Sequence, residues 1–227
     1  MYMSVAFRPH LEILPPAQRR LWDEVAPLYS DFVLYGGTAV ALHLGHRASL
    51  DFDFFGWTAF DPDRLYRLLP FLHGAEVLQK AADTLTCLVD RSGEVRISFF
   101  GVPGLGQVRE PLVCPGNGVR VAALIDLAGV KAAVVQKRAE AKDYLDLDAI
   151  LAHDIDLPAA LAAAGHIYGR AFNPQITLKA LTYFADGDLA TLPEAIRQRL
   201  TQAVKGVRLD RLPDVKELRH RPSASRQ

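Results

Sequence analysis

One segment in the first quarter of the sequence constrains the fold most, because two strand signals flank a glycine pair and a short helix. The apolar run 32–35 is of strand type and stops at Gly36-Gly37. Residues 38–45 contain few helix breakers and follow at once, with Thr38 as the predicted N-cap. Residues 50–55 alternate aspartate with aromatic side chains, which predicts a second strand.

The glycine turn has the features of a phosphate site. Gly36 and Gly37 let the backbone approach a ligand closely and adopt positive φ. The free amides at the start of the next helix, with the positive end of the helix dipole behind them, favour an anion. We therefore expect a phosphate at Gly36, Gly37 and Thr38.

The second strand carries a pair of carboxylates. Asp51 and Asp53 are two residues apart, so on a strand they face the same side. Like charges held this close repel each other, and a divalent cation relieves the repulsion. Mg²⁺ suits the pair, because it binds one or two carboxylates and takes substrate phosphates as further ligands. Arg47, four residues before Asp51, is placed to neutralise either a phosphate or the aspartate pair.

These residues together resemble the signature of the nucleotidyltransferase fold, and more narrowly the AbiEii/AbiGii-type toxin family. The matching positions are Gly36, Gly37, Gly45, His46, Arg47, Ser49, Asp51 and Asp53. The resemblance implies an α+β fold in which a small mixed sheet with flanking helices precedes a helical part. It also implies that Asp51 and Asp53 bind magnesium and the nucleoside triphosphate, with Ser49 and Arg47 among the nucleotide-binding residues.

The resemblance extends to a second, helical segment, where Lys131, Lys142, Asp143 and Asp146 match the family pattern. Asp143 and Asp146 are three residues apart and share a helix face. In a continuous helix Lys131 and Lys142 would share a basic stripe with Arg138. The resemblance gives Lys131 a phosphate-binding role, and gives Asp143 or Asp146 the task of assisting the acceptor hydroxyl or holding Lys131. The residues alone equally allow ordinary surface pairs, such as Lys142 with Asp146.

The sequence departs from many nucleotidyltransferases on a later strand. Many of them place a third carboxylate there, but the candidate strand 95–100 offers Arg96 and Ser98 at the alternating positions. Glu94, at the start of that strand, is a weak substitute. We therefore expect one bound magnesium ion in place of a two-metal mechanism.

The remaining elements suggest an order of mixed α/β followed by helices. Residues 61–73 read as a helix, and strands at 84–89 and 95–100 flank a turn. Residues 101–118 are rich in Gly and Pro, and an alanine-rich helical region with a break near 139–141 follows from residue 121. This order predicts a nucleotidyltransferase-like core at 1–118, a helical part at 119–210 that closes the cleft, and a flexible basic tail at 211–227.

Composition excludes several classes of protein. Among 227 residues, 50% are hydrophobic and 23% charged, which is typical of a globular protein and excludes a disordered one. Twenty-six basic residues balance 26 acidic ones, so net charge gives no argument for nucleic acid. Two cysteines without a pairing or zinc pattern, and no apolar run of about 18 residues, indicate a cytoplasmic protein without a membrane span.

These expectations converge on nucleotidyl transfer from a nucleoside triphosphate to an acceptor hydroxyl. The family resemblance adds the context: a toxin of a type IV toxin–antitoxin or abortive-infection system, with a cognate antitoxin and an RNA acceptor such as the tRNA 3′ end. Two alternatives stay open. One is a phosphotransferase that modifies protein or RNA, and the other is an inactive module that binds nucleotide or RNA.

Overall fold

The computed structural model describes residues 7–25 and 31–220. Within these ranges the fold is α+β, as predicted, with a seven-stranded mixed sheet. Its contacts divide the chain into two compact units. We call Met1–Leu105 with Pro111–Ala122 the sheet unit, and Gly106–Glu110 with Ala123–Gln227 the helical unit.

The sheet unit is built on strands in the order β3-β4-β5-β2-β1-β7-β6. The bounds are β1 Phe32–Tyr35, β2 Asp51–Gly56, β3 Glu76–Ala81, β4 Thr84–Asp90, β5 Glu94–Gly101, β6 Leu112–Val113 and β7 Arg120–Val121. β1 and β2 are antiparallel, whereas β2 and β5 are parallel. The four strands expected from the sequence are present, and β3, β6 and β7 are additional.

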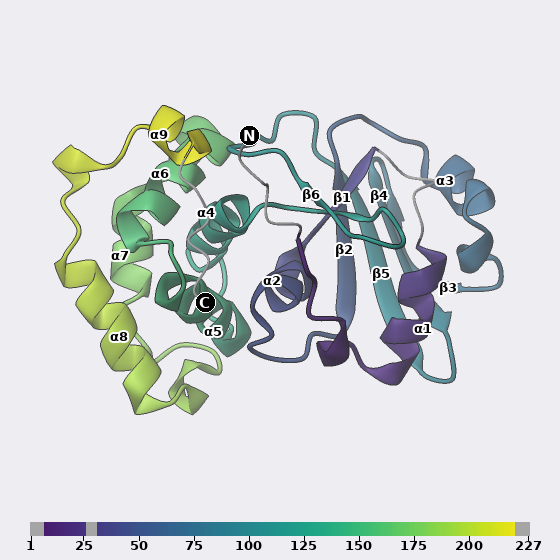
Figure 1. Ribbon diagram of the computed structural model, residues 1–227, viewed down its shortest axis with the longest axis horizontal. Coiled ribbons are helices and arrows are strands. Elements are labelled where there is room, and N and C mark those ends of the chain that lie inside the picture. The colour runs from purple at the N-terminus through teal and green to yellow at the C-terminus, as the bar shows by residue number, and fades with distance from the viewer. Residues whose placement is uncertain (1–6, 26–30, 221–227) are drawn as a thin grey trace. The chain divides into compact units, whose positions relative to one another are not determined.

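Helices cover both faces of this sheet (Figure 1). They are η1 Leu11–Ile13, α1 Pro16–Glu24, α2 Gly36–Leu44, α3 Pro62–Leu68 and η2 Pro70–Leu72. α1 and α3 lie on one face, and α2 lies on the other. α1 carries Trp22, whose ring lies 5.8 Å from the ring of Phe52. The apolar core of this unit is therefore on the α1 side of the sheet, where Phe52, Ile97 and Phe99 are buried.

Local chemistry explains where several of these elements begin and end. Pro16 occupies the first turn of α1, where its missing N–H costs nothing. Asp61 caps α3 by accepting a hydrogen bond from the backbone N–H of Arg64 at 2.7 Å. The β4–β5 hairpin turns at Ser92 and Gly93, both at positive φ, as the predicted turn requires.

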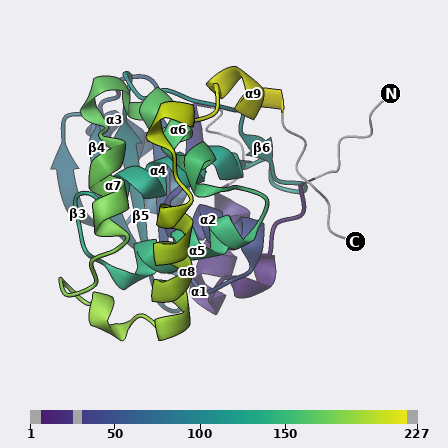
Figure 2. The ribbon, with the colours of Figure 1, turned by 90° about the vertical axis from the view of Figure 1, so that its left-hand side faces the viewer.

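The helical unit is formed by the elements after residue 122 together with the short segment Gly106–Glu110. Its elements are α4 Leu124–Val134, α5 Ala141–Ala152, α6 Leu157–Tyr168, η3 Gly169–Ala171, α7 Pro174–Ala180, η4 Leu189–Thr191, α8 Glu194–Lys205, η5 Leu209–Arg211 and α9 Val215–His220 (Figure 2). α4 is buried on nearly all sides and packs against α5 and α6. A helix that is apolar around its whole circumference is a core helix, so α4 organises this unit.

Two sequence predictions about the chain's organisation differ from the structure. The predicted boundary after residue 118 is replaced by one after Ala122, because Val121 pairs with Leu34 and so joins β7 to the sheet. Part of the predicted flexible tail, Val215–His220, is helical and buries Leu218. Of the other residues of that predicted tail, 211–214 are described, with Arg211 ending η5, and 221–227 lie outside the described residues.

Candidate active site

The glycine turn and the aspartate strand meet within the sheet unit. β1 ends at Tyr35, which pairs with Asp53 of the antiparallel strand β2, and α2 begins at the next residue, Gly36. Gly36 has a φ of +72°, and a Cβ at this position would collide with Oδ2 of Asp53. The Asp53 carboxylate therefore lies against the first residue of α2, in space that only glycine leaves open.

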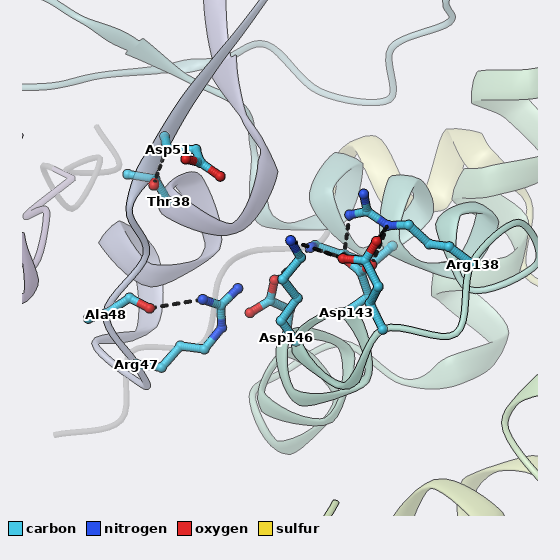
Figure 3. A network of polar contacts seen from close by, with 10 residues as sticks. Thr38, Arg47, Ala48, Asp51, Arg138, Asp143 and Asp146 are labelled. Carbon is cyan, nitrogen blue, oxygen red and sulfur yellow. Dashed lines mark hydrogen bonds and ion pairs between the residues drawn. The ribbon is translucent and has the colours of Figure 1, made fainter. Parts of the chain in front are cut away.

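Thr38 joins the same two elements by a different contact. Its hydroxyl donates a hydrogen bond to the main-chain carbonyl of Asp51, and its side chain is buried (Figure 3). Thr38 is therefore not the N-cap that the sequence predicted, because α2 begins two residues earlier with Tyr35 as N-cap. The Tyr35 side chain makes no capping hydrogen bond to the first turn of α2.

The two aspartates share one face of the sheet, as predicted. β2 alternates half-buried Asp51, Asp53 and Phe55 with Phe52, Phe54 and Gly56, which are buried. On this face Phe55 stacks on Tyr35, with their ring centroids 4.8 Å apart. The aromatic pair lies beside the carboxylates on the same strands, so the aspartates have a rigid neighbour.

The neighbouring strand β5 presents Arg96 next to Asp51 and Ser98 next to Asp53. The Thr86 hydroxyl donates a hydrogen bond to Oγ of Ser98 at 3.2 Å, and both residues are buried. Glu94 pairs with Asp90 at the hairpin end of the strand, two positions beyond Arg96. The position next to Asp53 that a third carboxylate would occupy therefore holds a hydroxyl.

The metal ligands predicted from the sequence are that pair of carboxylates. Across the described ranges, no group of three or more His, Cys, Asp or Glu side chains is arranged to hold a metal ion. Asp51 and Asp53 provide two oxygen donors on one face, against the backbone of Gly36. An ion bound there takes its remaining ligands from water and substrate, and this is the coordination that Mg²⁺ prefers.

Two of the other predicted nucleotide-binding residues of this unit, Arg47 and Ser49, lie in the loop between α2 and β2. Arg47 donates a hydrogen bond from Nη1 to the carbonyl of Ala48 at 2.9 Å (Figure 3). Ser49 is half-buried in the same loop. Gly37 follows Gly36 in the first turn of α2. The roles of these three residues in binding nucleotide remain predictions.

In the helical unit, Lys131 lies in a buried cluster of charges. Its Nζ is 2.7 Å from Oδ1 of Asp143 and 2.6 Å from Oδ2 of Asp146. Arg138 binds Asp143 from the other side, with Nε 2.7 Å from Oδ2 (Figure 3). Burial alone raises the pKa of Asp143, but the Arg138 hydrogen bond and the charge of Lys131 outweigh it and hold that pKa below its usual value.

This geometry shows which acidic side chains of the helical segment contact Lys131. Asp143 and Asp146 share a face and together hold Lys131, as one of the roles implied by the resemblance requires. Lys142 is exposed and pairs with Glu140 at 2.9 Å. The continuous helix on which a shared basic stripe would depend does not form, because α4 ends at Val134 and α5 begins only at Ala141.

Arg138 is the member of this cluster whose role the sequence argument missed. It lies in the loop between α4 and α5, five residues before Asp143, at a spacing that no helix face explains. The sequence did contain one signal for this role. A basic residue a few positions before a helix can form an ion pair with an acidic side chain in the first turn of that helix. Asp126, a buried acid within the apolar helix α4, was likewise not singled out.

Comparison with known proteins decides the family. Residues 19–221 match the family model described as nucleotidyl transferase AbiEii toxin, type IV toxin–antitoxin system. The chain belongs to the AbiEii family. An uncharacterized protein of Aquifex aeolicus (strain VF5) is 32% identical over 183 residues, which cover 76% of this chain and 84% of that protein.

A solved structure agrees with this assignment at the level of the fold. MenT4, described as a nucleotidyltransferase toxin of Mycobacterium tuberculosis H37Rv, matches with a TM-score of 0.58 and 16% identity over 84% of each chain. A weaker match, with a TM-score of 0.41 and 12% identity, is to the Megavirus polyadenylate synthase, over 63% of this chain and 30% of that one. The AbiEii chain thus has the fold of a nucleotidyltransferase toxin.

Proposed function

We propose that this AbiEii protein transfers a nucleoside monophosphate from a nucleoside triphosphate to a hydroxyl of an RNA acceptor, and so acts as the toxin of a type IV pair. The close approach of Asp53 to Gly36 at the start of α2 carries the proposal. A carboxylate lies there against the start of a helix, and a metal-bound triphosphate would need both a carboxylate for the metal and helix amides for the phosphates.

The site residues of the sheet unit have different tasks in this scheme. The amides of Gly36, Gly37 and Thr38 bind phosphate oxygens, and the Thr38 hydroxyl keeps β2 against α2. Asp51 and Asp53 would hold Mg²⁺, which when bound neutralises phosphate charge. The acceptor hydroxyl forms a bond to the α-phosphorus in line with the departing pyrophosphate, whose P–O bond breaks.

The test is a transfer assay. The protein is incubated with MgCl₂, total RNA and each nucleoside triphosphate labelled at the α-phosphate, and we expect label in RNA with one or more nucleotides. The variants Asp51→Asn and Asp53→Asn should lose transfer, and so should the wild type in EDTA. Asp63→Asn is the matched control, because Asp63 is an exposed acid of the same unit that pairs with Lys80.

The same assay separates the alternatives. Label that enters RNA or protein only from the γ-phosphate would make the chain a phosphotransferase. Binding of a triphosphate without any product would make it an inactive nucleotide-binding module. Lys131→Ala is tested separately, and loss of transfer in a folded variant would support the predicted role of Lys131.

A cognate antitoxin follows from the family context. Expression of the wild-type chain should arrest growth, and co-expression of an antitoxin gene found beside its own gene should relieve the arrest. The Asp51→Asn variant should cause no arrest in the first place. An arrest caused equally by that variant would separate toxicity from nucleotidyl transfer.

Localisation has less support than family. Within residues 7–25 and 31–220, none of the helices combines the length and apolarity that crossing a bilayer demands.

A further inference from the structure

The helical unit contains a cavity of about 300 Å³ that the sequence predictions did not anticipate. One wall is the loop between α4 and α5, with Lys137 and Arg138. The other wall is α7 and the turn that follows it, with Ile176, Lys179 and Tyr183. Ligand sites in proteins have volumes of roughly 300 to 1,000 Å³, so this cavity suits one small group such as a single nucleotide.

Hydrogen bonds hold the walls in place. Nε2 of Gln136 donates to the carbonyl of Asn173 at 2.8 Å and to Oγ1 of Thr177 at 2.7 Å. Thr177 in turn donates its hydroxyl to the carbonyl of Ala132 at 2.7 Å, in a buried position. The α4–α5 loop and α7 are therefore tied together by side chains, and the cavity between them is formed before any ligand binds.

The turn after α7 closes the other end of the cavity. Gly187 packs so closely against the carbonyl of Ala139 that a Cβ at Gly187 would overlap it. Asp188 accepts a hydrogen bond from the backbone N–H of Ala141 at 2.6 Å. These contacts anchor the turn to the start of α5, and they set the position of Tyr183 and Asp186 on the cavity rim.

The charges that line the cavity favour an anion. Lys137, Arg138 and Lys179 face one acidic residue, Asp186. Arg138 is committed to Asp143, but Lys137 and Lys179 are exposed, and Lys137 Nζ lies 6.0 Å from the ring centroid of Tyr168. Two lysines on opposite walls leave a positive excess over the single carboxylate, which is suited to a phosphate.

The apolar part of the rim favours a flat ring. Tyr183 is 54% exposed and Ile176 is 46% exposed, and both line the cavity. Ile176 lies on α7 and Tyr183 lies three residues after that helix ends, so the rim combines a helix residue with a residue of the following turn. An exposed aromatic ring beside lysines is the combination with which proteins bind single-stranded nucleic acid, because bases stack on the ring and cations hold the phosphate.

We propose that this cavity receives one nucleotide of a single-stranded RNA, with the base against Tyr183 and a phosphate between Lys179 and Lys137. The proposal rests on the proposed function, because it gives the RNA acceptor a binding site in the helical unit. A protein partner suits the site less well, since a cavity of about 300 Å³ admits only a small group and exposed lysines flank its apolar lining.

The experiment measures binding of a fluorescein-labelled, mixed-sequence 12-nucleotide RNA by fluorescence anisotropy at low salt, without nucleoside triphosphate. Tyr183→Ala should weaken binding about tenfold, which equals about 1.4 kcal/mol. Lys179→Glu should weaken it as much and reduce its salt dependence. Tyr183→Phe keeps the ring and should bind like the wild type. Lys205→Glu, the same charge change at an exposed base of α8 outside the cavity lining, is the matched control.

Each outcome bears on the proposal separately from the transfer reaction. Wild-type transfer to RNA with unchanged RNA binding by Tyr183→Ala and Lys179→Glu would overturn the cavity assignment and leave the proposed function standing. Cavity-dependent RNA binding without any transfer would support the assignment and count against the proposed function. Displacement of the RNA by micromolar free AMP would show that a free nucleotide is the occupant and overturn the RNA assignment.

Discussion

The side chain of Lys131 is almost entirely buried, with 4% of its surface exposed to solvent. Burying an ammonium group alone would be prohibitively unfavourable, and a single carboxylate would compensate only part of that. Asp143 and Asp146 both contact it, and Arg138 offsets the second negative charge. The four formal charges sum to zero, so the cluster fixes the positions of its members without a net charge.

Removal of the lysine should therefore cost much more than removal of a nearby surface lysine. We expect Lys131→Met to lower the free energy of unfolding by about 3–5 kcal/mol, because it leaves two buried carboxylates without their shared cation. Lys142→Met removes a lysine of the same helical segment that is exposed and pairs with Glu140, and it should change stability by less than about 1 kcal/mol. Urea titration followed by circular dichroism measures both, and equal losses would contradict the buried-cluster interpretation.

At the residue scale, the sequence predicted correctly which side chains share a face, where the spacing of two residues alone determines it. Asp51 and Asp53 share a face because strand residues two apart must, and Asp143 and Asp146 do so because helix residues three apart must. The assignment of Thr38 as N-cap failed because the positive φ of Gly36 lets the helix start two residues early. The glycine pair allows that backbone conformation, but the sequence does not show that the Asp53 carboxylate occupies the space a side chain at Gly36 would need.

Among the elements, strands were predictable where one or both faces are apolar. β1 is buried at all four positions, and β2 alternates strictly. β3 was missed because all six of its residues are exposed, so it shows no hydrophobic period. It forms at the sheet edge by pairing with β4, an interaction that only the tertiary structure provides.

The packing of α4 against α6 depends on a glycine in mid-helix. A Cβ at Gly129 would lie 2.9 Å from the backbone nitrogen of Ala164 and 3.0 Å from the carbonyl carbon of Ala163. Backbone atoms cannot move aside as the end of a flexible side chain can. The two helices therefore approach each other over small residues, and the alanine-rich composition of this region reflects that close contact.

This contact predicts opposite effects for two glycine substitutions. Gly129→Ala should destabilise the protein by about 1–3 kcal/mol, because it forces α4 and α6 apart. Gly165→Ala, on α6, meets nothing within 4 Å and should be neutral or stabilising by up to about 1 kcal/mol through better helix propensity. Thermal unfolding of both variants tests this, and a stable Gly129→Ala protein would show that the helices can adjust.

At the scale of the whole molecule, the chain path between the two units is unusual. The five residues Gly106–Glu110 belong to the helical unit, although the segments on either side belong to the sheet unit. Asp126 of α4 holds them, accepting hydrogen bonds from the backbone N–H of Val108 at 2.7 Å and of Arg109 at 3.0 Å. Arg109 extends the attachment by donating from Nε to the carbonyl of Leu218 at 2.7 Å.

This attachment should make stability depend on pH near neutrality. Burial raises the pKa of Asp126 from 3.8 to about 6, against the opposing effects of the two backbone hydrogen bonds and the charges of His166 and Arg109. Because the folded-state pKa is the higher one, this group's contribution is complete below about pH 4 and is lost as pH rises through 6. The difference amounts to about 3 kcal/mol.

The measurement compares the wild type with Asp126→Asn, which is similar in size and does not titrate. We expect the free energy of unfolding of the wild type to fall between pH 4 and 7 relative to the variant. The variant should also be less stable at pH 5, because its amide can accept only one of the two backbone N–H groups. Parallel pH profiles for the two proteins would contradict the role given to Asp126.

Because Gly106–Glu110 belongs to the helical unit, the chain cannot be divided simply into two fragments. A cut after Ala122 would leave the five residues on the amino-terminal fragment, although their hydrogen-bonding partners are on the other. The carboxyl-terminal fragment would then have to fold around an acid that has lost both of its donors. The segment Gly106–Glu110 thus belongs to the fold of the carboxyl-terminal half, and a single cut does not separate the two units.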